Sequence, residues 1–174
     1  MTITEEQESY HYINSSEQEF LKLLSEKDIR YVLIGGHAVN YYGHHRVTRD
    51  LDILIDRTPE NVERLLGALR FMRIDIPADA SVRLLQTRVK MPLPRLNIDV
   101  LTSIDWCDLS FENMYSERNK VAFDFGAASL VSFEHLLHMK SNSEREKDQQ
   151  DYKALLSIQS DQSGREDGCS HKNK

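Results

Sequence analysis

The sequence has few cysteines, no long hydrophobic run and no excess of basic residues. Cys107 and Cys169 are the only cysteines among 174 residues, which argues against a disulfide framework and favours a reducing, cytoplasmic location. No apolar run approaches the ~18 residues that a membrane-spanning helix needs, so we expect no membrane association. The acidic residues 5, 6 and 8 stand where a secretory signal would have a basic start and an apolar stretch, and we expect no such signal.

The charge balance is acidic. Lys and Arg total 22 and Asp and Glu total 28, which gives a formal net charge of −6. An extended nucleic-acid-binding surface would require a basic footprint. An RNA partner is therefore possible through a local basic patch but is not indicated by charge.

The length and composition predict one globular domain. Hydrophobic residues make up 40% of the chain and charged residues 29%, which is typical of a folded protein with a core. Residues 1–13 are polar and acidic, and 159–174 are almost free of hydrophobic residues. We expect a flexible N-terminus, a domain over 14–158 that includes C-terminal helices, and a disordered tail over 159–174.

Extended and helical patterns alternate along 14–158, which predicts an α/β (α+β) fold with a mixed sheet of four or five strands flanked by helices. Ser16 and Glu19 have the spacing of a capping box, and residues 91–94 resemble a turn. The expected strands cover 29–34, 51–55, 82–89, 96–101 and 121–125, and the expected helices begin near Ser16, His37, Thr58, Ser132 and Glu144.

Two aspartates stand at the start of a predicted strand. Asp50 and Asp52 are two residues apart, so their side chains point to the same face with Cα atoms ~6.6 Å apart. Such a pair repels itself unless a cation offsets the charge, and carboxylate oxygens suit Mg²⁺. In the alternative interpretation, Asp50 is a turn cap and Asp52 an exposed edge residue.

A glycine pair separates the first strand from a helix. Gly35 and Gly36 allow backbone N–H groups to approach a phosphate at the start of a helix. The alternative is a tight turn without a ligand. Alone, the pair indicates little.

The order and spacing of these features are more specific. A buried strand ends in Gly35-Gly36, thirteen residues intervene, and Asp50-Leu51-Asp52-Ile53 begins another strand. This arrangement resembles the nucleotidyltransferase superfamily that includes DNA polymerase β, in which a third acidic residue lies on a later strand. Ile98-Asp99-Val100 fits that third element.

One branch of the superfamily is the most similar. The lead-in Arg46-x-Thr48-x-Asp50 resembles the small bacterial branch that holds lincosamide-type antibiotic nucleotidyltransferases and toxins of abortive-infection systems. Residues of the C-terminal helices resemble a further helix of that branch, namely Lys140, Arg145, Lys147, Asp148 and Asp151.

The resemblance implies a minimal nucleotidyltransferase fold and a Mg²⁺-dependent enzyme. It would move a nucleoside monophosphate from ATP or another NTP to a hydroxyl of a small molecule, an RNA or a protein, with two metal ions at the site. The implied catalytic and metal-binding residues are Asp50, Asp52 and Asp99, with Asp99 as general base. The implied nucleotide-binding residues are Gly35, Gly36, Arg46, Arg49 and Lys140.

Other interpretations stay open at this level. Arg49 is also suited to pair with the aspartates, and Lys140 to a helix C-terminus. Asp148 and Asp151 have the spacing of a charged helix face with ion pairs to Arg145 or Lys147, and Asp56 fits a strand-exit cap. The protein as a whole is also consistent with a toxin–antitoxin component that acts with a partner or as a homodimer, or with a catalytically silent nucleotide-binding module.

Overall fold

The structure, a computed structural model, describes residues 13–167, with side chains as far as residue 161. Its strands are β1 (Tyr31–Ile34), β2 (Leu51–Ile55), β3 (Lys90–Leu93), β4 (Ile98–Leu101), β5 (Asn119–Phe123) and β6 (Gly126–Leu130). Its helices are α2 (Ser15–Glu26), α3 (Gly35–Tyr41), α4 (Pro59–Phe71), α5 (Ala80–Leu84), α6 (Phe111–Ser116), α7 (Phe133–Ser141) and α8 (Glu146–Asp167).

All strands join one mixed sheet in the spatial order β3-β4-β2-β1-β6-β5. β1 runs antiparallel to β2 and parallel to β6, and β2 runs parallel to β4. The outer pairs, β3 with β4 and β5 with β6, are antiparallel. The predicted α/β (α+β) class is confirmed, and the sheet has six strands where four or five were expected.

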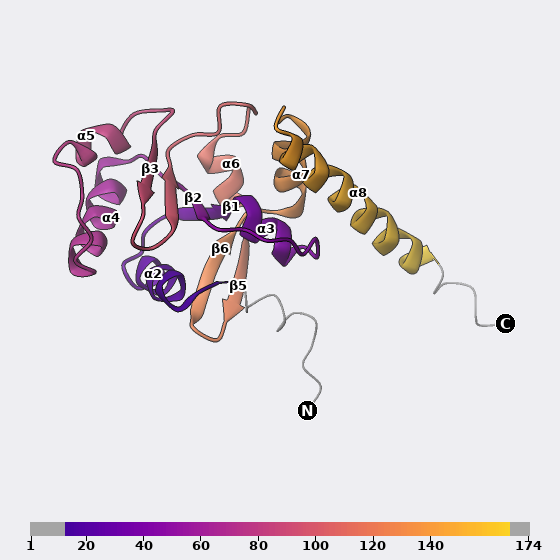
Figure 1. Ribbon diagram of the computed structural model, residues 1–174, viewed down its shortest axis with the longest axis horizontal. Coiled ribbons are helices and arrows are strands. Elements are labelled where there is room, and N and C mark those ends of the chain that lie inside the picture. Colours follow the sequence, from indigo (N-terminus) through magenta and orange to yellow (C-terminus); the bar gives the residue numbers. More distant parts are fainter. Residues whose placement is uncertain (1–12, 168–174) are drawn as a thin grey trace.

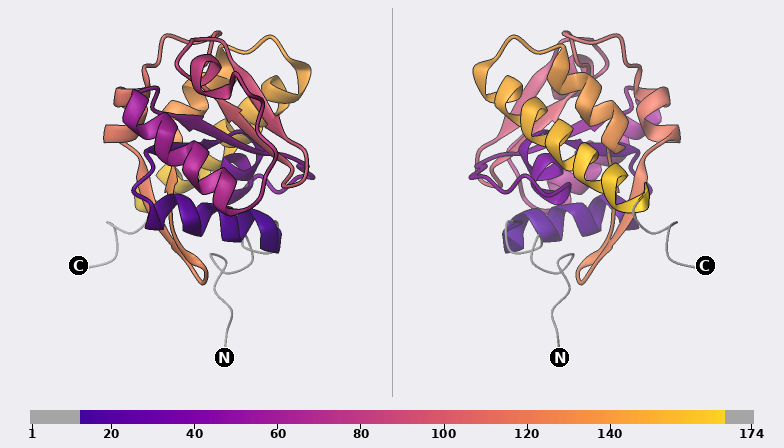
Figure 2. Two further views of the ribbon diagram at one scale, coloured as in Figure 1. Left: turned by 90° about the vertical axis from the view of Figure 1, so that its left-hand side faces the viewer. Right: turned by 90° about the vertical axis from the view of Figure 1, so that its right-hand side faces the viewer.

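Helices cover the sheet in two groups. α2 and α4 lie together beside the middle strands, whereas α7 and α8 form a helical pair on the side of the molecule away from α4 (Figures 1 and 2). α3 follows β1 directly and contacts β1, β2 and α7. No helix within the described residues has the length and apolarity needed to cross a bilayer.

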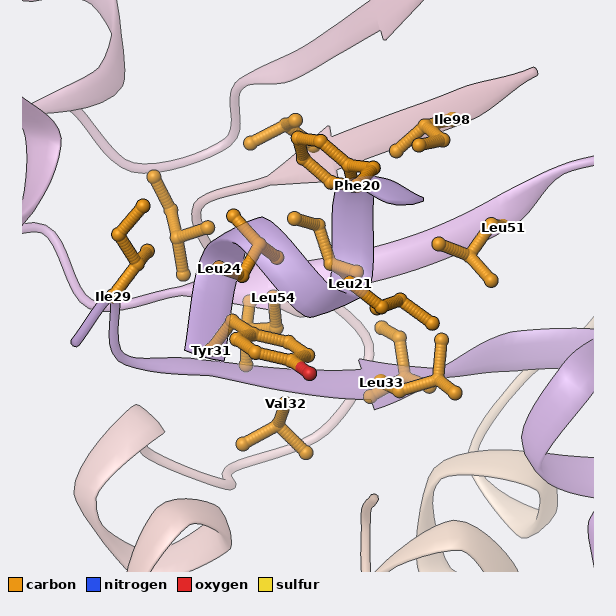
Figure 3. Packing of buried hydrophobic residues seen from close by; sticks show 14 of the residues in the cluster. Phe20, Leu21, Leu24, Ile29, Tyr31, Val32, Leu33, Leu51, Leu54 and Ile98 are labelled. Atoms are coloured by element: carbon orange, nitrogen blue, oxygen red, sulfur yellow. The ribbon is translucent and has the colours of Figure 1, made fainter. Parts of the chain in front are cut away.

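The core lies between α2 and the sheet. Phe20, Leu21 and Leu24 of α2 have no exposed surface, and they lie over β1 from one face in Figure 3. Tyr31 and Leu33 of β1 pack toward this helix, since alternate strand residues share a face. The other face of the central strands is apolar as well, with Val32 and Leu54 buried on it, and the polar residues described below stand only at one end of that face.

Several predicted boundaries differ from the structure. The capping box of α2 is formed by Asn14 and Glu17, not by Ser16 and Glu19. α8 extends to Asp167, so the prediction of disorder is wrong for residues 159–167, while 168–174 and 1–12 lie outside the described residues.

The expected strand over 82–89 is wrong. Residues 80–84 form α5, in which Ala80 and Leu84 are both buried, and their spacing of four is the period of a helix. The strand begins later, at Lys90, where prolines had suggested a turn. β3 is an edge strand, and Pro92 is tolerated there because an edge position leaves an N–H without a partner.

β6 was not predicted at all. Its sequence, Gly-Ala-Ala-Ser-Leu, contains no β-branched or aromatic residue and therefore carries a weak strand signal. α6 was not predicted either, and the strand expected over 121–125 is β5, which ends at Phe123. Two predictions are confirmed: Leu51–Ile55 is a strand, and Asp56 after it caps the chain by accepting the Thr58 N–H at 3.2 Å and an Arg30 N–H at 2.5 Å.

Candidate active site

The strand register places two aspartates beside each other. β2 and β4 are parallel neighbours, and Asp52 is the pairing partner of Asp99. Paired residues of adjacent strands point to the same face of a sheet. Asp99 is 7% exposed, whereas Asp50, which precedes β2, is exposed. The structure therefore gathers the three predicted acidic residues at one end of the central strands.

The glycine pair packs against this end of β2. Gly35 has φ +70°, and a Cβ added there would lie 2.2 Å from Oδ2 of Asp52. A Cβ at Gly36 would lie 2.4 Å from Oγ1 of Thr48. Both positions therefore require glycine because other side chains approach the backbone too closely. The bend between β1 and α3 is a tight turn and also one wall of the acidic site.

A cavity of about 330 Å³ opens beside the acidic residues. Every residue predicted for the site lines it: Asp50, Asp52, Asp99, Gly35, Gly36, Arg46, Arg49 and Lys140. A second cavity of about 220 Å³ adjoins the first and shares Asp52 and Lys140 with it. Its walls are more apolar and include Val89, Leu101 and Trp106.

A lysine that the sequence interpretation missed lies at the acidic residues. Nζ of Lys90 is 2.6 Å from Oδ2 of Asp99. Lys90 belongs to β3, whose residues are alternately exposed and buried, and this alternation was the available signal. It was obscured by the prolines on either side of Leu93.

A network of buried ion pairs holds the opposite wall. Asp151, fully buried on α8, accepts two hydrogen bonds from Arg46 at 2.6 and 2.7 Å and an ion pair from Lys140 at 2.9 Å. Asp148 accepts from Lys140, from Ser143 and, at 2.6 Å, from Arg145. These contacts join α7, α8 and the loop before β2.

This network corrects two interpretations. Asp148 and Asp151 do not belong to an exposed charged helix face, because they are 3% and 0% exposed; the expected pair of Asp148 with Arg145 is present, but Asp151 pairs with Arg46 and Lys140. Lys140 is buried and held by both aspartates. Arg49 is exposed, and no ion pair joins it to another residue of the described chain.

Burial and charge shift the pKa values of these groups in opposite directions. Burial, followed by the neighbouring Asp99, raises the pKa of Asp52 from 3.8 to about 6, against the influence of Lys90 and Lys140. Burial alone would also raise the pKa of Asp148 and Asp151, yet their hydrogen bonds from lysine and arginine hold both below the ordinary value. The site therefore combines one carboxylate that resists ionisation with two that favour it.

His37 is a further buried group beside the glycine pair. Burial, followed by the positive charge of Arg46, lowers its pKa to about 4, so the ring is neutral at pH 7. Its Nε2 atom has no hydrogen-bond partner among the described residues. His37 does not line the acidic cavity, so it is not assigned a role there.

Asp50 and Asp52 together are suited to bind a divalent cation. Carboxylate oxygens are the ligands that Mg²⁺ prefers, and Mg²⁺ takes its remaining ligands from water and phosphates. Burial is the main reason for the raised pKa of Asp52, and the neighbouring negative charge of Asp99 adds to it; a bound cation would offset both effects. Within residues 13–167, however, no three His, Cys, Asp or Glu side chains are grouped so as to hold a metal ion together.

The close approach of Gly35 to Asp52 predicts a strong effect of a small substitution. Gly35→Ala should lower the free energy of unfolding by at least ~1–2 kcal/mol, because alanine disfavours positive φ and its Cβ would overlap the carboxylate. Gly67→Ala is the matched control: it lies within α4 with no atom near the added Cβ, and should stabilise by ~1 kcal/mol. Urea unfolding of both variants measures this, and equal effects would contradict the contact.

The buried network predicts that Asp151 is essential for stability. Asp151→Asn leaves Lys140 and Arg46 without their counter-charge and should cost about 3 kcal/mol, which corresponds to roughly 10 °C in Tm for a chain of this size. Asp161→Asn changes an exposed residue of the same helix and should leave Tm within about 1 °C. Similar thermal scans for the two variants would refute the network's role.

The raised pKa of Asp52 predicts that this residue destabilises the fold at neutral pH. The folded state binds the proton more tightly than the unfolded state, so the stability that Asp52 contributes is present below pH 4 and is lost as pH rises through about 6. Asp52→Asn should therefore raise Tm at pH 7.5, by an amount equivalent to at most about 3 kcal/mol. The gain should disappear toward pH 4.

The exposed neighbour supplies the control. Asp50→Asn should leave Tm nearly unchanged at both pH values, because Asp50 is exposed to solvent. A Tm of Asp52→Asn that lies below that of the original chain at pH 7.5 would show that the Asp52 carboxylate is stabilising instead.

No protein-family model matches the chain, and no curated protein is similar to it.

Proposed function

We propose that this protein is a nucleotidyltransferase that moves a nucleoside monophosphate from an NTP to a hydroxyl group. The observation that carries the proposal is the pairing of Asp52 with Asp99 across parallel strands, with Asp50 two residues away and a glycine bend closed against Asp52. The chain's sequence resemblance to the polymerase-β-like superfamily agrees with this geometry. Its closest likeness there is to the small bacterial branch.

The acidic residues divide the chemistry between them. Asp50 and Asp52 would hold Mg²⁺, which neutralises charge on the phosphate oxygens when bound. Asp99 is the general base: it accepts the proton of the acceptor hydroxyl as the acceptor oxygen forms its bond to the α-phosphorus. The bond between the α-phosphorus and the bridging oxygen to the β-phosphate breaks, and pyrophosphate leaves with the electron pair.

The cationic residues predicted for the cavity fall into two groups: those paired with buried aspartates and one that is exposed. Arg46 and Lys140 are paired with buried aspartates, so they shape the wall of the cavity and their charges are largely matched there. Arg49 is exposed at the same cavity and is suited to the triphosphate. Gly35 and Gly36 line the cavity as well and leave room for a phosphate to approach the backbone.

Label transfer tests the proposal. The purified chain is incubated with a cell extract, Mg²⁺ and each of the four α-³²P-labelled NTPs, and labelled products are separated into protein, RNA and small molecules. A labelled acceptor should appear with at least one NTP and should be lost with EDTA. Asp52→Asn should reduce the label by at least ~100-fold, because the variant removes a cation ligand next to the base.

Two further samples make the result specific. Asp124→Asn alters an exposed aspartate in the turn between β5 and β6, at the other end of the sheet order, and should label like the original chain. The proposal is overturned if Asp52→Asn labels as strongly as the original chain. It is equally overturned if the protein binds an NTP with Mg²⁺ but transfers nothing from any of the four.

A further inference from the structure

Lys90 is a positively charged residue that lies directly beside the three acidic residues of the candidate site. Its Nζ lies 2.6 Å from Oδ2 of Asp99 and is attracted by Asp52 and Asp50 as well. On the edge strand β3, Lys90 pairs with Leu101, and Asp99 lies two residues from Leu101 on the same face. Such diagonal neighbours are ~7–8 Å apart at Cα, a distance that a lysine side chain spans. The strand register therefore aims this ammonium group at Asp99.

The other lysine at the site is not equivalent. Nζ of Lys140 is shared by Asp148 and Asp151, so its charge is already matched by two carboxylates. Lys90 is 60% exposed at its side chain, and Asp99 is its partner in the structure. Lys90 is thus the cation whose charge is directed to the three acidic residues.

The charge balance limits how many divalent ions the acidic residues can hold. Asp50, Asp52 and Asp99 carry three negative charges when ionised, and Lys90 reduces this to two, the charge of one divalent cation. The Lys90 ammonium also takes an oxygen of Asp99 that a second ion would need as a ligand.

We propose that Lys90 stands in the place of a second metal ion, so that the site binds one divalent cation, at Asp50 and Asp52, and Asp99 is positioned by Lys90. The inference rests on the proposed function for its meaning in catalysis, and it departs from the two ions that the sequence resemblance implies. Lys90 acts through Asp99 and is a positioning residue. An ammonium group supplies fixed positive charge without the ligand demands of a metal ion.

Counting bound Mn²⁺ on the full chain tests this inference without any turnover. The fraction of free Mn²⁺ is followed by electron paramagnetic resonance as the ion is added to the original chain, Lys90→Met, Lys90→Arg and Lys120→Met. The original chain and Lys90→Arg should bind one ion. Lys90→Met should bind a second ion at least about tenfold more tightly than the original chain does. Lys120 lies exposed on β5, the opposite edge strand, so Lys120→Met should bind one ion.

The outcomes separate the two proposals. Two ions on the original chain, or one ion on Lys90→Met with native circular dichroism, overturns the role of Lys90 and leaves the nucleotidyltransferase proposal in place. Binding of no ion by any variant removes the cation site at Asp50 and Asp52 and with it the proposed function. One bound ion on Lys90→Arg but two on Lys90→Met supports a role for the positive charge at position 90. If the lysine stem had only a structural role, the two variants would bind the same number of ions.

Discussion

Repulsion between carboxylates is the constraint around which this end of the molecule is organised. The parallel register of β2 and β4 fixes Asp52 next to Asp99, and neither backbone can move without breaking the centre of the sheet. The fold therefore cannot relieve the repulsion by separating the strands. It places cations nearby instead: Lys90 pairs with Asp99, and Lys140, itself paired with Asp148 and Asp151, has a weaker influence on Asp52. Burial, with the repulsion from Asp99 added to it, leaves the pKa of Asp52 raised, and perturbed pKa values of this kind cluster at functional sites.

The second organising feature is the burial of opposite charges between α8 and the loop before β2. Buried ion pairs seldom add net stability, but they are specific, since a removed partner leaves an uncompensated charge. Here Asp151 of α8 binds Lys140 from the preceding helix α7 and Arg46 from the loop before β2, which is distant in sequence, so one carboxylate joins three segments. The loop that leads into the acidic residues is fixed in this way by a helix near the end of the chain.

The sequence predicted the parts of the site that depend on local rules. Strand alternation predicted that Asp50 and Asp52 share a face, whereas Asp99 was identified only through the resemblance to the nucleotidyltransferase superfamily; the structure pairs Asp52 with Asp99. Lys90 was missed because its role depends on a hairpin register between two short strands. Asp151 was expected to pair with Arg145 or Lys147 of its own helix, because partners from other segments cannot be recognised from helix periodicity. Strand 126–130 lacks the side chains that favour strands, and it forms because β1 and β5 provide partners on both sides.

The contact between Gly35 and Asp52 has a consequence for how sequences of this fold can diverge. Any residue other than glycine at position 35 would place its Cβ where the carboxylate of Asp52 already lies. A homologous chain with a bulkier residue at position 35 would need a shorter one at 52, and would give up the carboxylate. A substitution of Gly35 is thus coupled to loss of the carboxylate at position 52, so positions 35 and 52 should vary together or not at all.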